Sequence, residues 1–134
     1  MVTDEAATKL AEVEIAKGTR YWTMQDDAGA YIALVGLYLD PVSEVRKLEP
    51  PQIIDVAVVP EHRGNGYARQ LLEVAEAIVW ASGHRHIWLF TDGENQDLHV
   101  FYTHLGYRRA GELPGYWGPG SMKAFYVKES PNEA

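Results

Sequence analysis

The chain has 134 residues, 46% of them hydrophobic and 23% charged, and it carries a formal net charge of −7. This length and composition favour one globular domain over residues 1–134, and the lack of a long apolar run argues against a membrane span. Cysteine is absent, which excludes disulfides and thiolate chemistry and is compatible with a cytoplasmic location. The acidic balance disfavours a nucleic acid partner and mildly favours a cationic amine, although solubility alone explains the same charge.

The N-terminal segment predicts a helix. Thr3 or Asp4 can cap it, and it would run to about Lys17. Leu10 and Val13 are three residues apart and would both face inward.

A hairpin is expected next. Residues 20–25 and 30–39 are rich in β-branched and aromatic side chains, which are typical of strands. The segment Asp26-Asp27-Ala28-Gly29 between them is a turn signal, so the two strands should pair antiparallel. Residues 40–52 contain Pro41, Pro50 and Pro51 and predict a surface loop.

A strand, a loop with two glycines and a helix follow over residues 53–80. The run from Ile53 to Pro60 is rich in β-branched residues and ends at a proline. The helix is indicated by apolar residues that recur at helical spacing, namely Ala68, Leu71, Leu72, Ala75, Ile78 and Val79. Gly64 and Gly66 allow a close approach of the backbone to a ligand, and Arg63 adds a fixed positive charge. Because the first turn of a helix offers free N–H groups and partial positive charge, this arrangement predicts a phosphate-binding site.

The rest of the chain predicts a strand, a helix and two further strands. Their expected ranges are, in order, 84–91, 96–105, 107–113 and 121–128. The strands on either side of the first long helix should pair in parallel or splay apart. A glycine- and proline-rich loop over residues 114–120 joins the last two strands, and residues 131–134 are expected to fray.

Two motifs resemble those of the GCN5-related N-acetyltransferase (GNAT) family. The pattern Arg63-x-x-Gly66-x-Ala68 is similar to the family's pyrophosphate loop, [QR]-x-x-G-x-[GA]. The segment Asn95-x-x-Leu98-x-x-Phe101-Tyr102-x-x-Leu105-Gly106-Tyr107 is similar to N-x-x-A-x-x-[LF]-Y-x-x-x-G-[FY], with Leu98 in place of the usual alanine. Neither a dinucleotide loop nor a P-loop pattern is present. The resemblance implies a mixed α/β sheet of the GNAT type, with an acetyl-CoA-binding core over residues 52–106 and C-terminal strands over residues 107–128.

The resemblance also implies roles for individual residues. The pyrophosphate of acetyl-CoA would lie over Arg63, Gly64, Asn65, Gly66, Tyr67 and Ala68, with Arg69 either as a further contact or on an exposed helix face. A backbone N–H of Val58 or Val59 would polarise the thioester carbonyl. Asn95 would contact the pantetheine arm or a nearby backbone group. Tyr102 would protonate the departing thiolate, and the alternative for Tyr102 is a core residue of an amphipathic helix.

The general base has two candidates. Asp55 is the first, because it is an acidic residue on an apolar strand, where burial would raise its pKa. The alternative for Asp55 is a solvated or ion-paired strand carboxylate. His99 shares a helix face with Asn95 and Tyr102 and is the second candidate. The histidines form no metal-binding pattern, so we expect no metal.

The N-terminal region departs from the family pattern. The family opens with a strand and two helices, whereas one helix alone is expected here before residue 20. An opening strand is therefore expected to be missing, and the fold to be shortened at its N-terminus. This would leave the acceptor pocket open or require a second subunit, as in a homodimer.

Together these features predict transfer of an acetyl group from acetyl-CoA to a primary amine, a small molecule rather than a protein, within a ternary complex. Tyr116 and Trp117 are candidates for recognition of the acceptor, because aromatic rings bind cations, and Tyr21 and Trp22 are further candidates. The alternative function is that of a non-catalytic domain that binds an acyl-CoA as a sensor or an assembly module.

Overall fold

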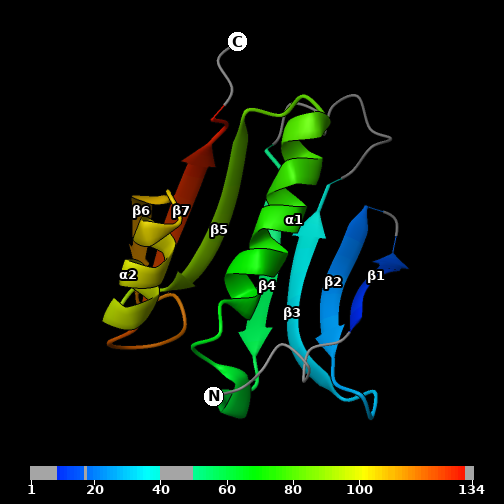
Figure 1. The fold of residues 1–134 in the computed structure, drawn as a ribbon. Coiled ribbons are helices and arrows are strands. Elements are labelled where there is room, and N and C mark those ends of the chain that lie inside the picture. The colour runs from blue at the N-terminus through cyan, green and yellow to red at the C-terminus, as the bar shows by residue number, and fades with distance from the viewer. Residues whose placement is uncertain (1–8, 17, 40–49, 132–134) are drawn as a thin grey trace.

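The computed structural model describes residues 9–16, 18–39 and 50–131 of the chain. They form one mixed sheet of seven strands in the order β1-β2-β3-β4-β5-β7-β6, with both helices on the same face (Figure 1). The elements are β1 (Lys9–Ala16), β2 (Thr19–Gln25), β3 (Tyr31–Tyr38), β4 (Gln52–Val58), a 3-10 turn (Pro60–His62), α1 (Tyr67–Ala81), β5 (His86–Asp92), α2 (Gln96–His104), β6 (Arg108–Pro114) and β7 (Met122–Glu129). The mixed α/β sheet expected from the sequence is confirmed.

The expected N-terminal helix is wrong over the residues that the structure describes. Residues 9–16 form strand β1, which pairs antiparallel with β2 from Lys9 opposite Gln25 to Ala16 opposite Thr19. The physical reason is visible in Ala-Glu-Val-Glu-Ile, residues 11–15, which alternates apolar and charged residues with the period of a strand. The opening strand that seemed to be missing is therefore present as an edge of the sheet. The proposed caps and the expected loop over residues 40–49 lie outside the described residues.

The hairpin of β2 and β3 is confirmed. The side chain of Asp26 closes the turn, because its Oδ1 accepts hydrogen bonds from the N–H groups of Ala28 and Ala30, each at 2.9 Å. Gly29 completes the turn with a φ of 85°, a left-handed conformation that glycine adopts without a steric penalty.

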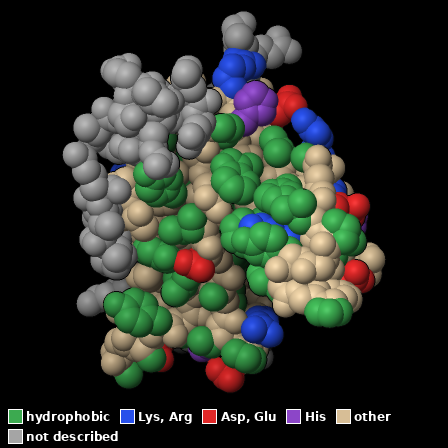
Figure 2. All heavy atoms as spheres, turned by 180° about the vertical axis from the view of Figure 1, so that it is seen from behind, with side chains coloured by type: hydrophobic (Ala, Val, Ile, Leu, Met, Phe, Trp, Pro, Cys, Tyr) green, Lys and Arg blue, Asp and Glu red, His purple; other side chains and the backbone are tan. Residues whose placement is uncertain are grey.

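The core lies between the sheet and α1. The buried face of α1 carries Leu71, Leu72, Ala75 and Val79, as its apolar periodicity predicts. These side chains pack into one cluster with buried residues of five strands and of the segments next to them, among them Trp22, Val35, Leu37, Ile87, Leu89, Tyr107 and Tyr126. Among the described residues no helix covers the opposite face, and Figure 2 shows hydrophobic side chains gathered over its middle.

The sheet is nearly divided between β4 and β5. These parallel strands pair at one position, Gln52 with Trp88, and diverge toward their C-terminal ends (Figure 1). The register between β3 and β4 shifts at Ile54, which is one extra residue on β4, and such a bulge bends its strand. The backbone beyond the bulge therefore has β3 on one side and an open gap on the other.

Candidate functional site

A cavity of about 660 Å³ opens at the divergent ends of β4 and β5. It is lined by Val56, Ala57, Val58, His62, Arg63, Gly64, Gly66, Tyr67, Ala68, Arg69, Asn95, Asp97, Leu98 and Phe101. Three elements thus meet there: the end of β4, the glycine loop with the first turn of α1, and the start of α2. The structure brings together most residues that the sequence predicts for coenzyme binding.

The glycine loop presents bare backbone to this cavity. Gly64 and Gly66 have φ values of 84° and 80°, and a Cβ added at either position would meet no atom within 4 Å. These glycines are therefore needed for backbone conformation, and they leave the space above the loop open. Gly66 is the N-cap of α1 and offers no side chain to bind the N–H groups of the first turn. Those N–H groups are available to an anion.

Asn65 and Arg63 brace the loop against the chain before it. The Asn65 amide Nδ2 donates to the His62 carbonyl at 2.9 Å. The Arg63 Nε donates to the Val58 carbonyl at 3.1 Å, so one edge of the guanidinium is tied to β4. Arg69 lines the cavity from α1 and pairs with Glu73 at 3.0 Å on the exposed helix face.

The backbone of β4 distinguishes the two candidate oxyanion donors. The Val59 N–H donates to the Ile32 carbonyl at 2.9 Å, so it points toward β3. Because successive N–H groups alternate in direction along a strand, the Val58 N–H points into the gap. Val58 lines the cavity and Val59 does not.

Two buried polar atoms at the cavity have no hydrogen-bond partner within residues 9–16, 18–39 and 50–131. They are the Tyr67 hydroxyl and the His62 Nδ1, and Tyr67 is only 3% exposed. Leaving such a group unsatisfied costs about 1–3 kcal/mol. A ligand with polar groups in this cavity would offset that cost, so the residues present fit a polar, anionic coenzyme.

Asn95 lines the coenzyme cavity and Tyr102 does not. Asn95 lines the cavity and caps α2, because its Oδ1 accepts the Leu98 N–H at 3.1 Å. Tyr102 is 5% exposed and packs in the core, with its ring centroid 5.8 Å from that of Tyr107 and 5.7 Å from that of Tyr126. Phe101 lines the cavity and also packs against the core cluster.

Burial raises the pKa of Tyr102 to about 12, and the neighbouring Tyr126 adds to the shift. Its hydroxyl is therefore protonated at neutral pH. His99 lies outside the cavity lining, and its Nδ1 is 2.8 Å from the Tyr126 hydroxyl.

Asp55 is exposed, so the expected burial of this carboxylate is wrong. It lies on the face of β4 opposite Val56, and no helix in the described part of the chain covers that face. The Tyr21 hydroxyl donates to Asp55 Oδ2 at 2.5 Å. This bond, with burial and the Asp55 charge as further causes, raises the pKa of Tyr21. Trp22, a further acceptor candidate, is buried in the core.

No group of three or more His, Cys, Asp or Glu residues within residues 9–16, 18–39 and 50–131 is placed to hold a metal ion. In the same residues no helix is long and apolar enough to cross a membrane.

Solved structures share this fold. A nourseothricin acetyltransferase superposes with a TM-score of 0.72 at 23% identity, covering 85% of this chain and 66% of its own. A Bacillus anthracis protein described as a streptothricin acetyltransferase, in complex with acetyl coenzyme A, gives 0.71 at 14% identity, with 87% and 65% covered. The spermidine/spermine N-acetyltransferase of Vibrio cholerae gives 0.66 at 20% identity, with 86% and 67% covered. The chain thus spans about two thirds of each of these proteins, and its fold is of the GNAT type.

The family follows from the sequence itself. The family model of the acetyltransferase (GNAT) family matches residues 3–107, which is most of the chain. This protein belongs to that family.

Proposed function

We propose that the protein transfers an acetyl group from acetyl-CoA to a primary amine of a small molecule, directly and within a ternary complex. The observation that carries the proposal is one continuous cavity that joins the free N–H groups of the first turn of α1 to the open edge of β4. Such a cavity suits an elongated coenzyme that has a charged pyrophosphate at one end and an amide-containing arm at the other.

On the donor side, the pyrophosphate would bind the backbone of residues 63–68, with the free guanidinium nitrogens of Arg63 and the side chain of Arg69 nearby. The pantetheine arm would add to the exposed edge of β4 as an extra strand does, with Asn95 facing it from α2. The Val58 N–H would then donate to the thioester oxygen and stabilise the charge that develops there. The hydroxyl of Tyr67 would find a partner on the coenzyme.

On the acceptor side, the neutral amine attacks the thioester carbon, the new C–N bond forms, and the C–S bond breaks. Asp55 would take the proton from the amine directly or through water. Tyr102 would protonate the thiolate, which its protonated state at neutral pH permits. This assignment requires the coenzyme to reach toward the buried hydroxyl of Tyr102, because that side chain lies outside the cavity lining.

The acceptor is proposed to be a small amine because the named relatives act on nourseothricin and on spermidine or spermine. We further propose that the protein is cytoplasmic and forms a homodimer. The transfer reaction does not depend on either property. The alternative is a non-catalytic module that binds an acyl-CoA without turnover.

Coenzyme binding is tested by the rise in melting temperature with increasing coenzyme A. Gly66→Glu should abolish this rise, because the carboxylate adds negative charge and bulk where the pyrophosphate would lie. Gly29→Glu is the matched control, since Gly29 has a φ of 85°, similar to that of Gly66, and the same open space around its Cα. If Gly66→Glu shows the same rise as the control, the phosphate site is not at this loop.

Turnover is tested by thiol release from acetyl-CoA with a panel of amines, in the wild type and in Tyr102→Phe. The wild type should release thiol with at least one amine, and the variant should turn over at least tenfold more slowly while it binds coenzyme equally well. Binding of coenzyme without release with any amine would favour the non-catalytic alternative.

A further inference from the structure

Arg63 connects the glycine loop to the open edge of β4. Its Nε donates to the Val58 carbonyl at 3.1 Å. That carbonyl faces the gap between β4 and β5, because a residue in a strand turns its N–H and its carbonyl toward the same side. The guanidinium therefore lies at the edge where a neighbouring strand, or the arm of a coenzyme, would pair with β4.

The rest of the guanidinium is free to bind an anion. Arg63 is exposed and lines the coenzyme cavity. Within the residues that the structure describes, its two terminal nitrogens form no hydrogen bond and no ion pair. Because a guanidinium is planar and carries donors on all three nitrogens, it can hold the carbonyl with Nε and a phosphate with the other two at the same time.

The segment between Val58 and Arg63 is braced before any ligand arrives. The Val59 carbonyl accepts the His62 N–H at 3.0 Å. The Arg63 N–H donates to the Pro60 carbonyl at 3.3 Å, which closes the 3-10 turn. The loop and the end of β4 are thus one unit, and the protein itself sets the position of the guanidinium relative to the strand.

An open strand edge alone does not fix the register of a ligand. Its N–H and carbonyl groups repeat every two residues, which is about 7 Å along the strand. An arm with amide groups can therefore pair one repeat out of place. Since a misplacement of about 1 Å can slow a reaction about a hundredfold, such a slip would remove the thioester from its donor. The coenzyme needs an anchor that marks where its arm ends and its pyrophosphate begins.

We propose that Arg63 is a positioning residue that sets the register of the coenzyme along β4. Its Nε keeps the Val58 carbonyl occupied, so the arm pairs with the strand edge only up to that point, and the terminal nitrogens bind the pyrophosphate that follows. One side chain then fixes the separation between the pyrophosphate and the Val58 N–H. The inference rests on the proposed function for the place of the coenzyme, but it does not depend on the acceptor or on turnover.

Two substitutions separate the two contacts of Arg63. Glutamine carries its amide nitrogen on Cδ, as arginine carries Nε, so Arg63→Gln keeps a donor for the Val58 carbonyl but loses the charge. Lysine keeps the charge on a single nitrogen. With the pyrophosphate bound, the ammonium of Arg63→Lys goes to the anion and leaves the carbonyl.

The test measures affinity and register separately. Calorimetric titration with coenzyme A gives the affinity, and amide hydrogen exchange at saturating coenzyme A gives the protection of the Val58 N–H. Arg63→Gln should bind coenzyme A about tenfold more weakly than the wild type, because charge-assisted hydrogen bonds are lost, and should keep the protection. Arg63→Lys should bind nearly as tightly as the wild type, yet its Val58 amide should exchange about tenfold faster.

Arg69 supplies the matched control. It also lines the coenzyme cavity, but its Nε pairs with Glu73 at 3.0 Å and not with β4. Arg69→Gln removes a charge from the cavity, as Arg63→Gln does, and Arg69→Lys keeps it. Both Arg69 variants should leave the protection of the Val58 amide at saturating coenzyme A unchanged.

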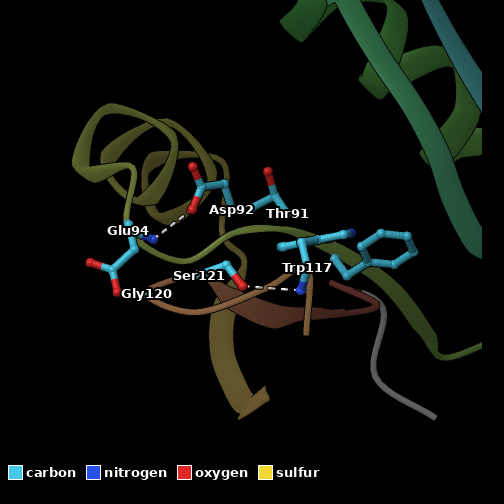
Figure 3. A pocket seen from close by; sticks show the side chains of 7 residues that line it. Thr91, Asp92, Glu94, Trp117, Gly120 and Ser121 are labelled. Atoms are coloured by element: carbon cyan, nitrogen blue, oxygen red, sulfur yellow. Dashed lines mark hydrogen bonds between the residues drawn. The ribbon is translucent and has the colours of Figure 1, made fainter. Parts of the chain in front are cut away.

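An amide remote from the coenzyme serves as the internal control. A second cavity, of about 540 Å³, lies at the end of β5 and shares no lining residue with the coenzyme cavity (Figure 3). There the Trp117 N–H donates to Ser121 Oγ at 3.0 Å (Figure 3). The Trp117 amide should exchange at the same rate in the wild type and in all variants.

A side chain that only stabilises the loop would change affinity and protection in the same direction in both Arg63 variants. Equal protection of the Val58 amide in Arg63→Gln and Arg63→Lys would therefore overturn the proposal. Faster exchange of the Trp117 amide together with the Val58 amide in Arg63→Lys would also overturn it, because the fold as a whole would then have loosened.

Thiol release separates this inference from the proposed function. If affinity and protection follow the expected pattern but no amine is acetylated, the role of Arg63 in register stands and the transferase assignment fails. If amines are acetylated with the same kcat by the wild type and by Arg63→Lys, the transferase assignment stands and the role of Arg63 in register is refuted.

Discussion

Three tyrosines have raised pKa values for different reasons. Tyr102 is raised to about 12 chiefly by burial. Tyr107 is raised by burial and then by the charge of Glu76, to which its hydroxyl donates. Tyr21 is raised first by its hydrogen bond to Asp55, so it keeps its proton and holds that carboxylate in place. Each of these hydroxyls therefore keeps its proton at neutral pH, and those of Tyr21 and Tyr107 donate it to a carboxylate.

Gly36 permits the contact between Tyr21 and Asp55. A Cβ at this position would lie 2.6 Å from Tyr21 Cε2 and 2.8 Å from Ile54 Cγ1. The ring of Tyr21 thus crosses β3 over a residue without a side chain and reaches the strand beyond. If Asp55 is the base, its orientation depends on a glycine that touches no substrate.

The burial of Tyr102 should make the fold sensitive to alkali. The unfolded chain loses the tyrosine proton near its ordinary pKa of about 10, whereas the folded chain keeps it to about 12. As the pH rises, the unfolded state loses this proton at a lower pH than the folded state does. The stabilisation of the folded state that is present below about pH 10 is therefore lost as the pH rises toward about 12. Two pKa units correspond to about 2.7 kcal/mol, an upper figure for this group.

Urea unfolding at about pH 8 and about pH 11.5 measures this loss. Tyr102→Phe should lose about 2 kcal/mol less than the wild type between these two pH values. Tyr116→Phe, which removes an exposed hydroxyl, should behave as the wild type does. Equal losses in Tyr102→Phe and the wild type would show that Tyr102 titrates normally.

At the scale of elements, one buried carboxylate ties α1 to the C-terminal part of the sheet. The side chain of Glu76 is 7% exposed. It accepts a hydrogen bond from the Tyr107 hydroxyl at 2.7 Å and one from Lys128 Nζ at 2.8 Å. The Glu76 carboxylate therefore joins α1 to the residue before β6 and to β7. Since α1 carries the glycine loop at its other end, this contact also helps to position the coenzyme site.

Glu76→Gln should lower the free energy of unfolding by about 2–3 kcal/mol, because it leaves Lys128 half-buried without a counter-ion. The control is Glu73→Gln on the exposed side of the same helix, which should change stability by less than about 1 kcal/mol. Urea unfolding of both variants at neutral pH measures the difference. If the two variants lose the same stability, the buried pair contributes no more than a surface pair does.

The elements that the sequence predicts well depend on local signals. The Asp26 side chain and Gly29 close the turn over residues 26–29, and Gly66 is the N-cap of α1. The N-terminal strand lacks a clear local signal. Leu10 and Val13 fit a helical spacing, while residues 11–15 alternate between apolar and charged residues as a strand does. Pairing with β2 decides between helix and strand. This pairing is a tertiary contact, which the intrinsic propensities of residues 9–16 do not encode.

The candidate site likewise contains residues that the sequence predicts and residues that it does not. The phosphate loop is predictable, because its chemistry belongs to consecutive residues. Which of Phe101 and Tyr102 faces the cavity depends on how α2 is rotated against β7, and a motif does not encode that rotation. The exposure of Asp55 likewise depends on whether another element covers the back of β4.

At the scale of the whole molecule, the sheet consists of two parts joined at one end. Strands β1 to β4 form one part, and β5, β7 and β6 form the other. The join is local to Trp88, whose backbone N–H donates to the Pro51 carbonyl at 3.1 Å and whose indole Nε1 donates to the Pro50 carbonyl at 3.2 Å. A coenzyme between β4 and β5 would replace the hydrogen bonds that the gap denies to β4. Ligand binding should therefore protect backbone groups as well as raise the melting temperature.

Amide hydrogen exchange along β4 tests this view with an internal control. The N–H groups of Val56 and Val58 point into the gap, whereas those of Ala57 and Val59 point toward β3. In the free protein the first pair should exchange at least tenfold faster than the second, because no backbone acceptor protects it. Saturating coenzyme A should slow the Val58 amide most, since that N–H is proposed to face the reactive end of the ligand. Uniformly slow exchange at all four amides without ligand would mean that β4 and β5 close on each other in solution, and the gap would not be available to a coenzyme.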